Sequence, residues 1–397
     1  MSKAHRNKLV RLLVIGQTPP PYVGQMLSIA SLVRAQLTGI EIHHVRMNYS
    51  HTVDEIGSVR IRKLFHLIRI MLESGYQIVR HRIDVIYYPP GAQTVPVLRD
   101  MATLLWLRLF RRKLMLVFYA SGVSETVAGW QGPLRWLFER AFFYPDAGVQ
   151  NSLLNPPDAA FVKAKNVYCR PNGVADEFVR PRVDRPPNPV PVILFVGMVR
   201  ADKGVDSLLE AAFILKQQQR KFLIRIVGEF ASDEYRTRLL RELQEQGLHD
   251  CVEFAGRKVA DEKWQAYQTA DVFCFPTYYP AESFGNVLLE AMMFELPVIT
   301  TRWRAIPGIV VEGETGFLVE IKNAAAIADR LAQLLDDEGL KERMGKKGRE
   351  RYRANYTIDQ YLERTREIVL EVSAAPNPTS RLSGSVAVAA ALVSDKL

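Results

Sequence analysis

Short apolar runs alternate with amphipathic stretches through the first half of the chain. We predict a buried strand at each run and a helix from about 24 to 36. The runs are VRLLVIG (10–16), IEIHHVRM (40–47), IDVIYY (83–88), KLMLVFYA (113–120) and DAGVQN (146–151). Strands that alternate with helices are typical of a parallel α/β sheet.

A second series of strands and helices follows VRPRVDRPPNPVP (179–191), whose prolines indicate a linker. We therefore predict an α/β protein of two Rossmann-like domains, 1–178 and 192–355, that face each other across a cleft. Ligands of such sheets bind beyond the carboxyl ends of the strands. The predicted strands of the second domain are VILFVGM (192–198), FLIRIVG (222–228), CVEFAG (251–256), DVFCFPT (271–277) and LPVITT (296–301).

Helical stretches end the second series, and the last of them, 356–372, is a candidate to cross back to the first domain. Residues 373–397 are small, polar and interrupted by prolines, so we expect a disordered tail.

Charge is distributed unevenly along the chain, whose net charge is +9. Residues 1–180 hold 23 Lys and Arg against 12 Asp and Glu, a net charge of +11, and the remainder carries −2. A basic first half suits a phosphate-bearing substrate, an anionic membrane or nucleic acid. An excess of solvated surface charge explains it equally well.

The three cysteines, Cys169, Cys251 and Cys274, are odd in number and widely spaced. This pattern indicates neither a disulfide framework nor a zinc site and is typical of a reducing cytoplasm. No stretch is long and apolar enough to span a bilayer, and the first residues enter a strand rather than a signal sequence. We expect a cytoplasmic protein, with peripheral contact to the inner face of the plasma membrane as an open alternative.

The candidate chemistry centres on ESFGNVLLE (282–290), where Glu282 and Glu290 flank a glycine at the expected start of an apolar helix. Gly285 lets a ligand approach the backbone closely, and the free N–H groups of a helix start suit a phosphate. We expect Glu290 to be partly buried, which is costly unless charged or hydroxyl-bearing groups contact it. These features favour a site that holds the two ends of a sugar nucleotide.

A second candidate element is FVGMVRADKG (195–204), in which a strand end precedes two basic residues. Arg200 and Lys203 are suited to neutralise a diphosphate, and Gly197 and Gly204 allow close approach. Two further strand ends carry glycines: IVGEF (226–230) with Gly228 and FAGRKV (254–259) with Gly256.

In order and spacing, these segments resemble the nucleotide-binding domain of GT-B glycosyltransferases of family four. The resemblance covers about residues 192–320, including TADVFCFPTYYPAESFGNVLLEAM and IPGIVVEGETGFLV, and it is looser in the first half. It implies a GT-B fold and a retaining transfer of a hexose from a UDP- or GDP-sugar.

The resemblance also implies roles for individual residues. Glu282 is expected to contact hydroxyls of the transferred sugar, Glu290 the ribose, and Lys203 with Arg200 the diphosphate. These cations replace a divalent metal electrostatically, so neither a metal nor a cofactor is expected. The alternative for Glu290 is an internal salt bridge without a ligand. The other implied donor-binding positions are Gly24, Gly197, Gly228, Gly256, Arg257, Ser283, Phe284, Gly285 and Asn286.

Three positions depart from the family pattern. Met198 stands where relatives often carry arginine, which makes Arg200 the substitute, and Gln25 replaces the second glycine of the first loop. The place of a histidine that many relatives have beside the sugar is taken here by Ala120 or by Tyr119. The Tyr119 hydroxyl is a candidate to donate a hydrogen bond there, although tyrosine is a poor general base at ordinary pH. Further candidates for sugar contact after this strand are Ser121 and Gly122.

The stretch 59–82 combines apolar residues with six arginines and lysines. Such a helix suits the surface of an anionic membrane, where many relatives find lipid-linked acceptors. The alternative is a domain helix whose apolar face joins the core.

We predict a retaining, metal-independent glycosyltransferase that acts on a glycan or lipid-linked saccharide, by analogy in bacterial surface polysaccharide biosynthesis. Nucleic acid is not expected as a partner. One alternative is a catalytically impaired relative that binds sugar nucleotides or serves as a partner subunit. Another is a sugar-nucleotide epimerase, which the lack of histidine between His81 and His249 disfavours.

Overall fold

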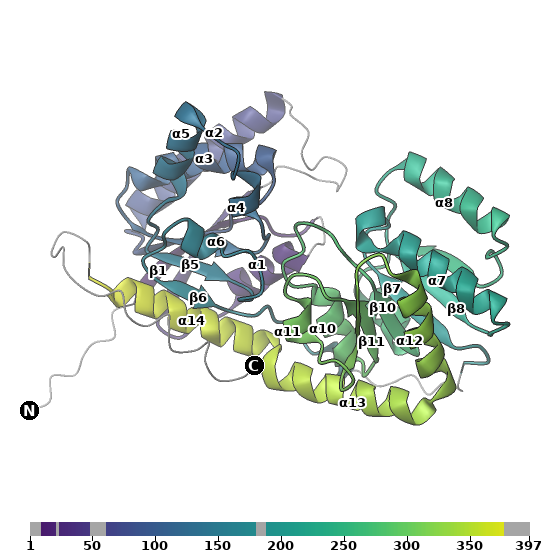
Figure 1. The fold of residues 1–397 in the computed structure, drawn as a ribbon. Helices are drawn as coiled ribbons and strands as arrows, with labels where there is room; N and C mark the ends of the chain where they lie inside the picture. The colour runs from purple at the N-terminus through teal and green to yellow at the C-terminus, as the bar shows by residue number, and fades with distance from the viewer. Residues whose placement is uncertain (1–8, 21–23, 48–60, 180–187, 377–397) are drawn as a thin grey trace, which may run out of the picture.

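The protein is described by a computed structural model that covers residues 9–20, 24–47, 61–179 and 188–376. Figure 1 shows two α/β domains side by side, with two long helices from the end of the chain running along one side of both. The predictions for the chain start, for most of the linker 179–191 and for the tail after residue 376 lie outside the described residues.

The first domain is built on a six-stranded parallel sheet. Its strands are β1 (Val10–Gly16), β2 (Ile40–Arg46), β3 (Val85–Tyr88), β4 (Lys113–Phe118), β5 (Ala147–Gln150) and β6 (Val167–Cys169). They pair in the order β2-β1-β3-β4-β5-β6. The helices are α1 (Gly24–Arg34), α2 (Ile61–Arg80), α3 (Thr94–Arg108), α4 (Val123–Thr126), α5 (Gly132–Phe142) and α6 (Asp158–Phe161), followed by a 3-10 turn, η1 (Glu177–Val179).

The second domain repeats this architecture. Its strands are β7 (Val192–Val196), β8 (Leu223–Val227), β9 (Val252–Gly256), β10 (Val272–Phe275), β11 (Val298–Thr301) and β12 (Gly316–Val319). All pairs are parallel, in the order β12-β11-β10-β7-β8-β9. The other elements are η2 (Ala201–Lys203), α7 (Val205–Gln217), α8 (Asp233–Glu245), α9 (Ala260–Gln268), α10 (Asn286–Met293), α11 (Ile306–Ile309), α12 (Ala324–Asp336), α13 (Glu338–Asn355) and α14 (Ile358–Ala374).

The central strands are buried on both faces, because helices cover both sides of each sheet. Every residue of β3, β5, β7, β10 and β11 is buried. Such strands read as continuous apolar runs, which is why the sequence predicts them. The two strands that the sequence missed, β6 and β12, are short and lie at sheet edges. The prediction of two Rossmann-like domains is confirmed.

Helix α14 closes the first domain, although it follows the second in sequence. Its start is fixed by a capping box between Thr357 and Gln360, which satisfies two backbone N–H groups. Ile368, Val369 and Val372 are buried in one core with residues of β1, β3 and β4. The expected helix at 356–372 therefore crosses back and continues to Ala374.

Candidate active site

The segment 276–285 joins β10 to α10 at the carboxyl edge of the second sheet. It ends at Gly285, whose φ of 80° and ψ of 64° lie in the left-handed region that favours glycine. The apolar residues that follow bury α10 on most sides. The free N–H groups of its first turn are therefore held rigidly at the edge where ligands of such sheets bind.

Lys203 and Glu282 form an ion pair, with 2.6 Å between Nζ and Oε2. Lys203 follows β7 and Glu282 follows β10, so two adjacent strands bring the pair together. The hydroxyl of Thr277 donates to the same carboxylate oxygen at 3.4 Å. The two charged side chains are 16% and 11% exposed, which leaves the pair shielded but open to a ligand.

The loop that carries Lys203 is held by backbone packing. The N–H of Tyr278 donates to the carbonyl of Asp202 at 2.8 Å. A Cβ on Gly204 would lie 2.0 Å from the carbonyl oxygen of Pro276, so this close approach requires glycine. The backbone at Lys203 is therefore fixed by the fold and does not depend on the ion pair of its side chain.

Arg200 lies near Lys203 but already has a counter-charge. Its Nε is 2.5 Å from Oδ1 of Asp202. The guanidinium carbon lies 5.0 Å from the centre of the Tyr279 ring, and Nζ of Lys203 lies 4.4 Å from the same ring. Burial raises the pKa of Tyr279, so this ring stays neutral at physiological pH. The structure thus gathers both predicted diphosphate ligands around one aromatic side chain.

Glu290 is 4% exposed, and both of its oxygens have partners. Nζ of Lys263 lies 2.5 Å from Oε1, and the hydroxyl of Tyr267 donates to Oε2 at 2.8 Å. Burial and the neighbouring carboxylate raise the pKa of Tyr267 well above its ordinary value, so the hydroxyl remains a donor. The structure forms the internal salt bridge that the sequence left as the alternative. The ribose contact stays a prediction, since each carboxylate oxygen has a further lone pair.

Ser283 joins the two domains. Its hydroxyl donates to the backbone carbonyl of Tyr119. The side-chain amide of Asn151 donates to the Ser283 hydroxyl at 3.2 Å, and that of Asn155 donates to the Ser283 carbonyl at 2.7 Å. The motif loop is therefore in direct contact with the first domain.

Asn286, the first residue of α10, makes a second contact between the domains. The amide of Asn172 donates to its Oδ1 at 2.9 Å, and a Cβ on Gly24 would lie 3.1 Å from its Nδ2. The Oδ1 atoms of Asn151, Asn155 and Asn172 are buried and accept no hydrogen bond within the described part of the chain. Buried acceptors that lack a partner are suited to donors on a ligand or on water.

The hydroxyl of Tyr119 lies in the core of the first domain. It is 2.6 Å from the hydroxyl of Tyr87 and also bonds that of Tyr361 on α14. Arg170 lies over the rings of Tyr119 and Tyr361, at 5.3 and 4.4 Å. The predicted hydrogen bond from the Tyr119 hydroxyl to a sugar has no support in this placement, because the hydroxyl is occupied by core partners. Only the backbone carbonyl of Tyr119 reaches the motif.

The predicted glycines serve different purposes. A Cβ on Gly228 would lie 1.8 Å from the carbonyl oxygen of Gly197, so packing between strand ends alone accounts for this glycine. No atom of the described residues lies within 4 Å of a Cβ on Gly256, which leaves this edge open. The neighbouring Arg257 pairs with Glu229 at 3.3 Å and is not committed to the core.

Three further candidates are engaged within the protein. Phe284 is 3% exposed and packs edge-on against Tyr356 at 5.9 Å, so only its backbone is free for a donor. Ser121 is also buried, and the N–H of Gly122 donates to Asp158 at 2.8 Å.

A bidentate ion pair also joins the two domains. Arg304 donates to both carboxylate oxygens of Glu125 on α4, at 2.9 and 2.7 Å.

The sequence analysis missed five residues that contact the motif: Lys263, Tyr267, Asn151, Asn155 and Asn172. The i,i+4 spacing of Lys263 and Tyr267 was a usable signal, because it places both on one face of a helix. Asn151 directly follows β5, where functional side chains of parallel sheets gather.

The described ranges contain no cluster of three or more His, Cys, Asp and Glu side chains suited to a metal ion. None of the helices in the same ranges combines the length and apolarity that crossing a bilayer requires.

Residues 179–351 match the family model described as glycosyl transferases group 1, a segment that holds Lys203, Lys263, Glu282 and Glu290. The segment 179–351 is thus a domain of the glycosyl transferases group 1 type. The match explains why the two carboxylates, the basic loop and the buried helix α10 occur together.

Curated relatives named as glycosyltransferases match about two fifths of the chain. The capsular polysaccharide biosynthesis glycosyltransferase CapM of Staphylococcus aureus is 33% identical over 160 residues, 40% of each chain. A D-inositol 3-phosphate glycosyltransferase of Corynebacterium diphtheriae is 35% identical over 172 residues, 42% of this chain and 39% of the relative. The chain thus spans only about two fifths of the length of these relatives.

Solved structures match over both domains. Sucrose-phosphate synthase from Thermosynechococcus elongatus has a TM-score of 0.71 at 20% identity, covering 92% of this chain and all of that one. The Anabaena protein HepE, solved with UDP-glucose, has a TM-score of 0.70 at 15% identity, covering 91% and 99%. At these identities the likeness establishes the GT-B fold.

Proposed function

We propose that this protein is a retaining glycosyltransferase that moves a hexose from a UDP- or GDP-sugar to a hydroxyl of a glycan or lipid-linked saccharide. We further propose that it acts in the biosynthesis of a surface polysaccharide. The observation that carries the proposal is the ion pair between Lys203 and Glu282 at the start of α10. The names of CapM and of HepE in its complex with UDP-glucose support the same choice.

The ion pair supplies the two groups that a donor needs. When a nucleoside diphosphate sugar binds, Lys203 leaves Glu282 and forms an ion pair with the diphosphate. The leaving oxygen of the diphosphate gains negative charge as its bond to the sugar breaks, and Lys203 stabilises this charge. The released carboxylate of Glu282 accepts hydrogen bonds from the sugar hydroxyls. The N–H groups at the start of α10 add a positive potential at the same position.

The transfer needs no histidine in this scheme. The acceptor oxygen forms its bond to the anomeric carbon on the face from which the diphosphate departs. Its proton passes to the leaving phosphate oxygen, so configuration is retained and charge is balanced. The buried hydroxyl of Tyr119 is compatible with this route, because no protein base is required.

One observation favours a second candidate, a partner subunit that binds sugar nucleotides without chemistry. The Tyr119 hydroxyl bonds Tyr87 and Tyr361 in the core, so this residue does not replace the family histidine. Thermal stabilisation by a panel of UDP- and GDP-sugars identifies the donor. Release of the nucleoside diphosphate and the anomeric configuration of the product, by NMR, then test the reaction. Donor binding with neither hydrolysis nor transfer on any acceptor would favour the partner subunit.

We expect EDTA to change the rate of donor turnover by less than about twofold. Lys203, Arg200 and the α10 amides supply the positive charge that a divalent metal supplies elsewhere. Turnover is measured after dialysis against EDTA and after addition of Mg²⁺ or Mn²⁺. An activity lost in EDTA and restored by either ion would show that these cations are insufficient.

We expect Tyr119→Phe to leave kcat/KM within about threefold of the wild type. The hydroxyl bonds Tyr87 and Tyr361, so its loss lowers the free energy of unfolding by about 1 kcal/mol. Steady-state kinetics and urea denaturation measure the two effects separately. A tenfold loss of kcat at unchanged stability would show that the hydroxyl takes part in the reaction.

A further inference from the structure

Helix α2 carries two apolar faces, only one of which is covered. Ile70 and Ile78, each 1% exposed, pack toward the sheet as in an ordinary domain helix. A second row of apolar side chains, here called the stripe, is 46–69% exposed. It consists of Leu64, Phe65, Ile68, Leu72, Tyr76 and Val79. Spacings of mostly three or four residues place this row along one line of about 20 Å. Core packing therefore does not account for the second face.

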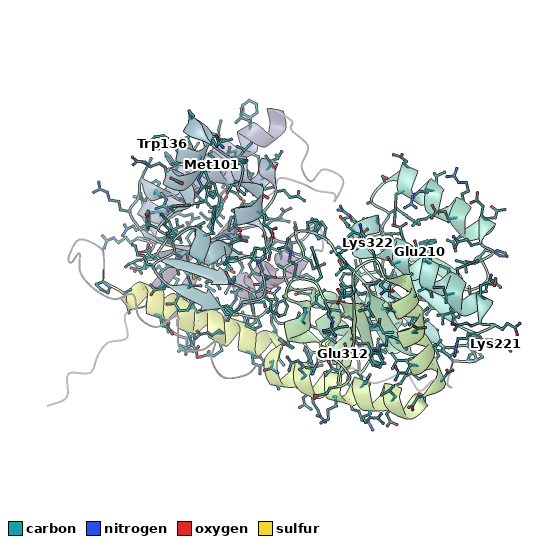
Figure 2. The ribbon with its side chains drawn as sticks, viewed as in Figure 1. Met101, Trp136, Glu210, Lys221, Glu312 and Lys322 are labelled. Carbon is teal, nitrogen blue, oxygen red and sulfur yellow. The ribbon has the colours of Figure 1, made fainter. Side chains whose placement is uncertain are left out.

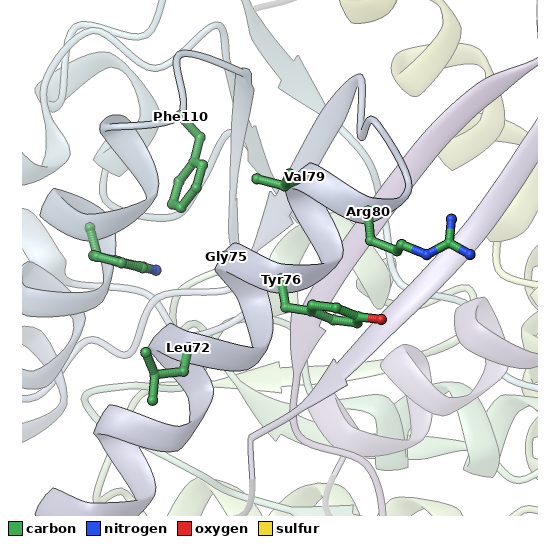
Figure 3. A pocket seen from close by; sticks show the side chains of 7 residues that line it. Leu72, Gly75, Tyr76, Val79, Arg80 and Phe110 are labelled. Carbon is green, nitrogen blue, oxygen red and sulfur yellow. The ribbon is translucent and has the colours of Figure 1, made fainter.

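An apolar groove lies beside this stripe, between α2 and α3. Its volume is about 440 Å³, and it is lined by Leu72, Gly75, Tyr76, Val79, Arg80, Trp106 and Phe110. Gly75 forms its floor, where a Cβ would lie 3.0 Å from both Trp106 and Phe110. In Figure 3, Val79 points toward Phe110, and Arg80 lies on a neighbouring face of α2. The indole N–H of Trp106 is buried and donates to no described residue.

Basic side chains border the stripe and the groove. On α2 itself Arg69 and Arg80 are exposed, whereas Glu73 is the one acidic residue of the helix. Three further exposed arginines follow the ends of the two helices: Arg82, Arg111 and Arg112. Apolar side chains flanked by arginines match a bilayer with anionic headgroups, which attract the charges while the hydrocarbon accepts the stripe.

Helix α5, which packs against α3, adds an exposed aromatic residue to the first domain. Trp136 is 55% exposed and lies at the outer end of the first domain in Figure 2. Tryptophan is enriched where membranes meet water, because its ring is apolar and its N–H is polar. Trp106 and Trp136 thus fit the same partner as the stripe.

We propose that this face is a docking surface for an anionic phospholipid bilayer. The exposed row of α2 lies among the acyl chains, and the groove between α2 and α3 receives one chain. The inference goes beyond the transfer reaction and does not require it.

Cosedimentation with phospholipid vesicles tests the docking surface. The full chain is expected to bind vesicles of phosphatidylcholine with phosphatidylglycerol at least tenfold more tightly than phosphatidylcholine alone, with the difference lost at high salt. The double variant Leu72→Ser/Val79→Ser should bind at least tenfold more weakly, since both side chains are exposed and their loss spares the core. Leu240→Ser on α8, with its side chain 44% exposed, is the matched control and should bind as the wild type does.

Lipids with brominated acyl chains test the groove, because they should quench the wild type more than Trp106→Phe. Failure of the wild type to bind, or equal binding by the double variant, would overturn the proposal. A dimer in analytical ultracentrifugation that the double variant dissociates would assign the stripe to a second copy of the chain instead. Donor binding measured without vesicles should be equal in both proteins, which separates this result from any failure of the proposed function.

Discussion

Lys203→Met is expected to lower kcat by about a hundredfold to a thousandfold. The amine is the predicted charge that meets the leaving diphosphate, and removing one such group from a shielded site costs roughly 3–4 kcal/mol in the transition state. The loop should keep its shape, because Gly204 and the backbone of Pro276 fix it independently of the amine. The measurement is turnover at saturating donor, compared with thermal stability of the same preparation.

Two variants serve as controls for Lys203. Arg200→Gln removes a neighbouring cation that is already paired with Asp202, so the expected loss of kcat is about tenfold or less. Glu282→Gln breaks the ion pair from the other side, and it should lower turnover while donor affinity stays near that of the wild type. A Lys203→Met enzyme within threefold of the wild-type kcat would contradict the assignment of the diphosphate site.

Glu290→Ala is expected to weaken donor binding by about fiftyfold and to lower the free energy of unfolding by roughly 3 kcal/mol. The first effect follows from the loss of charge-assisted hydrogen bonds to the ribose, each of about 1.5–3 kcal/mol. The second follows because Lys263, 17% exposed, loses its partner in a buried ion pair. Calorimetric titration with the nucleoside diphosphate and urea denaturation measure the two quantities.

Lys263→Met separates the two roles of Glu290. This variant breaks the same ion pair and should be destabilised by a similar amount, but it keeps the carboxylate and the hydrogen bond from Tyr267. Its donor affinity is therefore expected to stay within about fivefold of the wild type. If both variants lose donor affinity equally, Glu290 is a structural residue and the ribose contact is wrong.

Much of the fold could be predicted from the sequence, because strands buried on both faces appear in it as unbroken apolar runs. The run 192–198 is an example, because it contains β7 and all five residues of that strand are buried in the core. The edge strand β6 gave no such signal, because it has three residues and none of them is buried. Its pairing partner β5 decides that it is a strand, and a partner cannot be read from a three-residue segment.

The site was predictable where one loop carries it and less so where distant segments meet. The chemical types of Glu282 and Lys203 indicated their pairing with a donor, and the fold brings them within 2.6 Å. The burial of the Tyr119 hydroxyl, which was a candidate to contact the sugar, follows from the alternation of side chains along a strand. Phe118 packs in the core on one face of the sheet, so Tyr119 enters the core on the other, under α14. That helix follows more than two hundred residues later in the sequence, so no pattern near Tyr119 predicts the contact between them.

The return of α14 has a consequence for how the protein is made. Ile368, Val369 and Val372 complete the core on one face of the first sheet, yet a ribosome adds them after the whole second domain. At typical synthesis rates the interval between β5 and these residues is roughly twenty seconds. The second domain can therefore become native while the first still has one face of its sheet uncovered. In this protein the domain that begins first in sequence is the last to be finished.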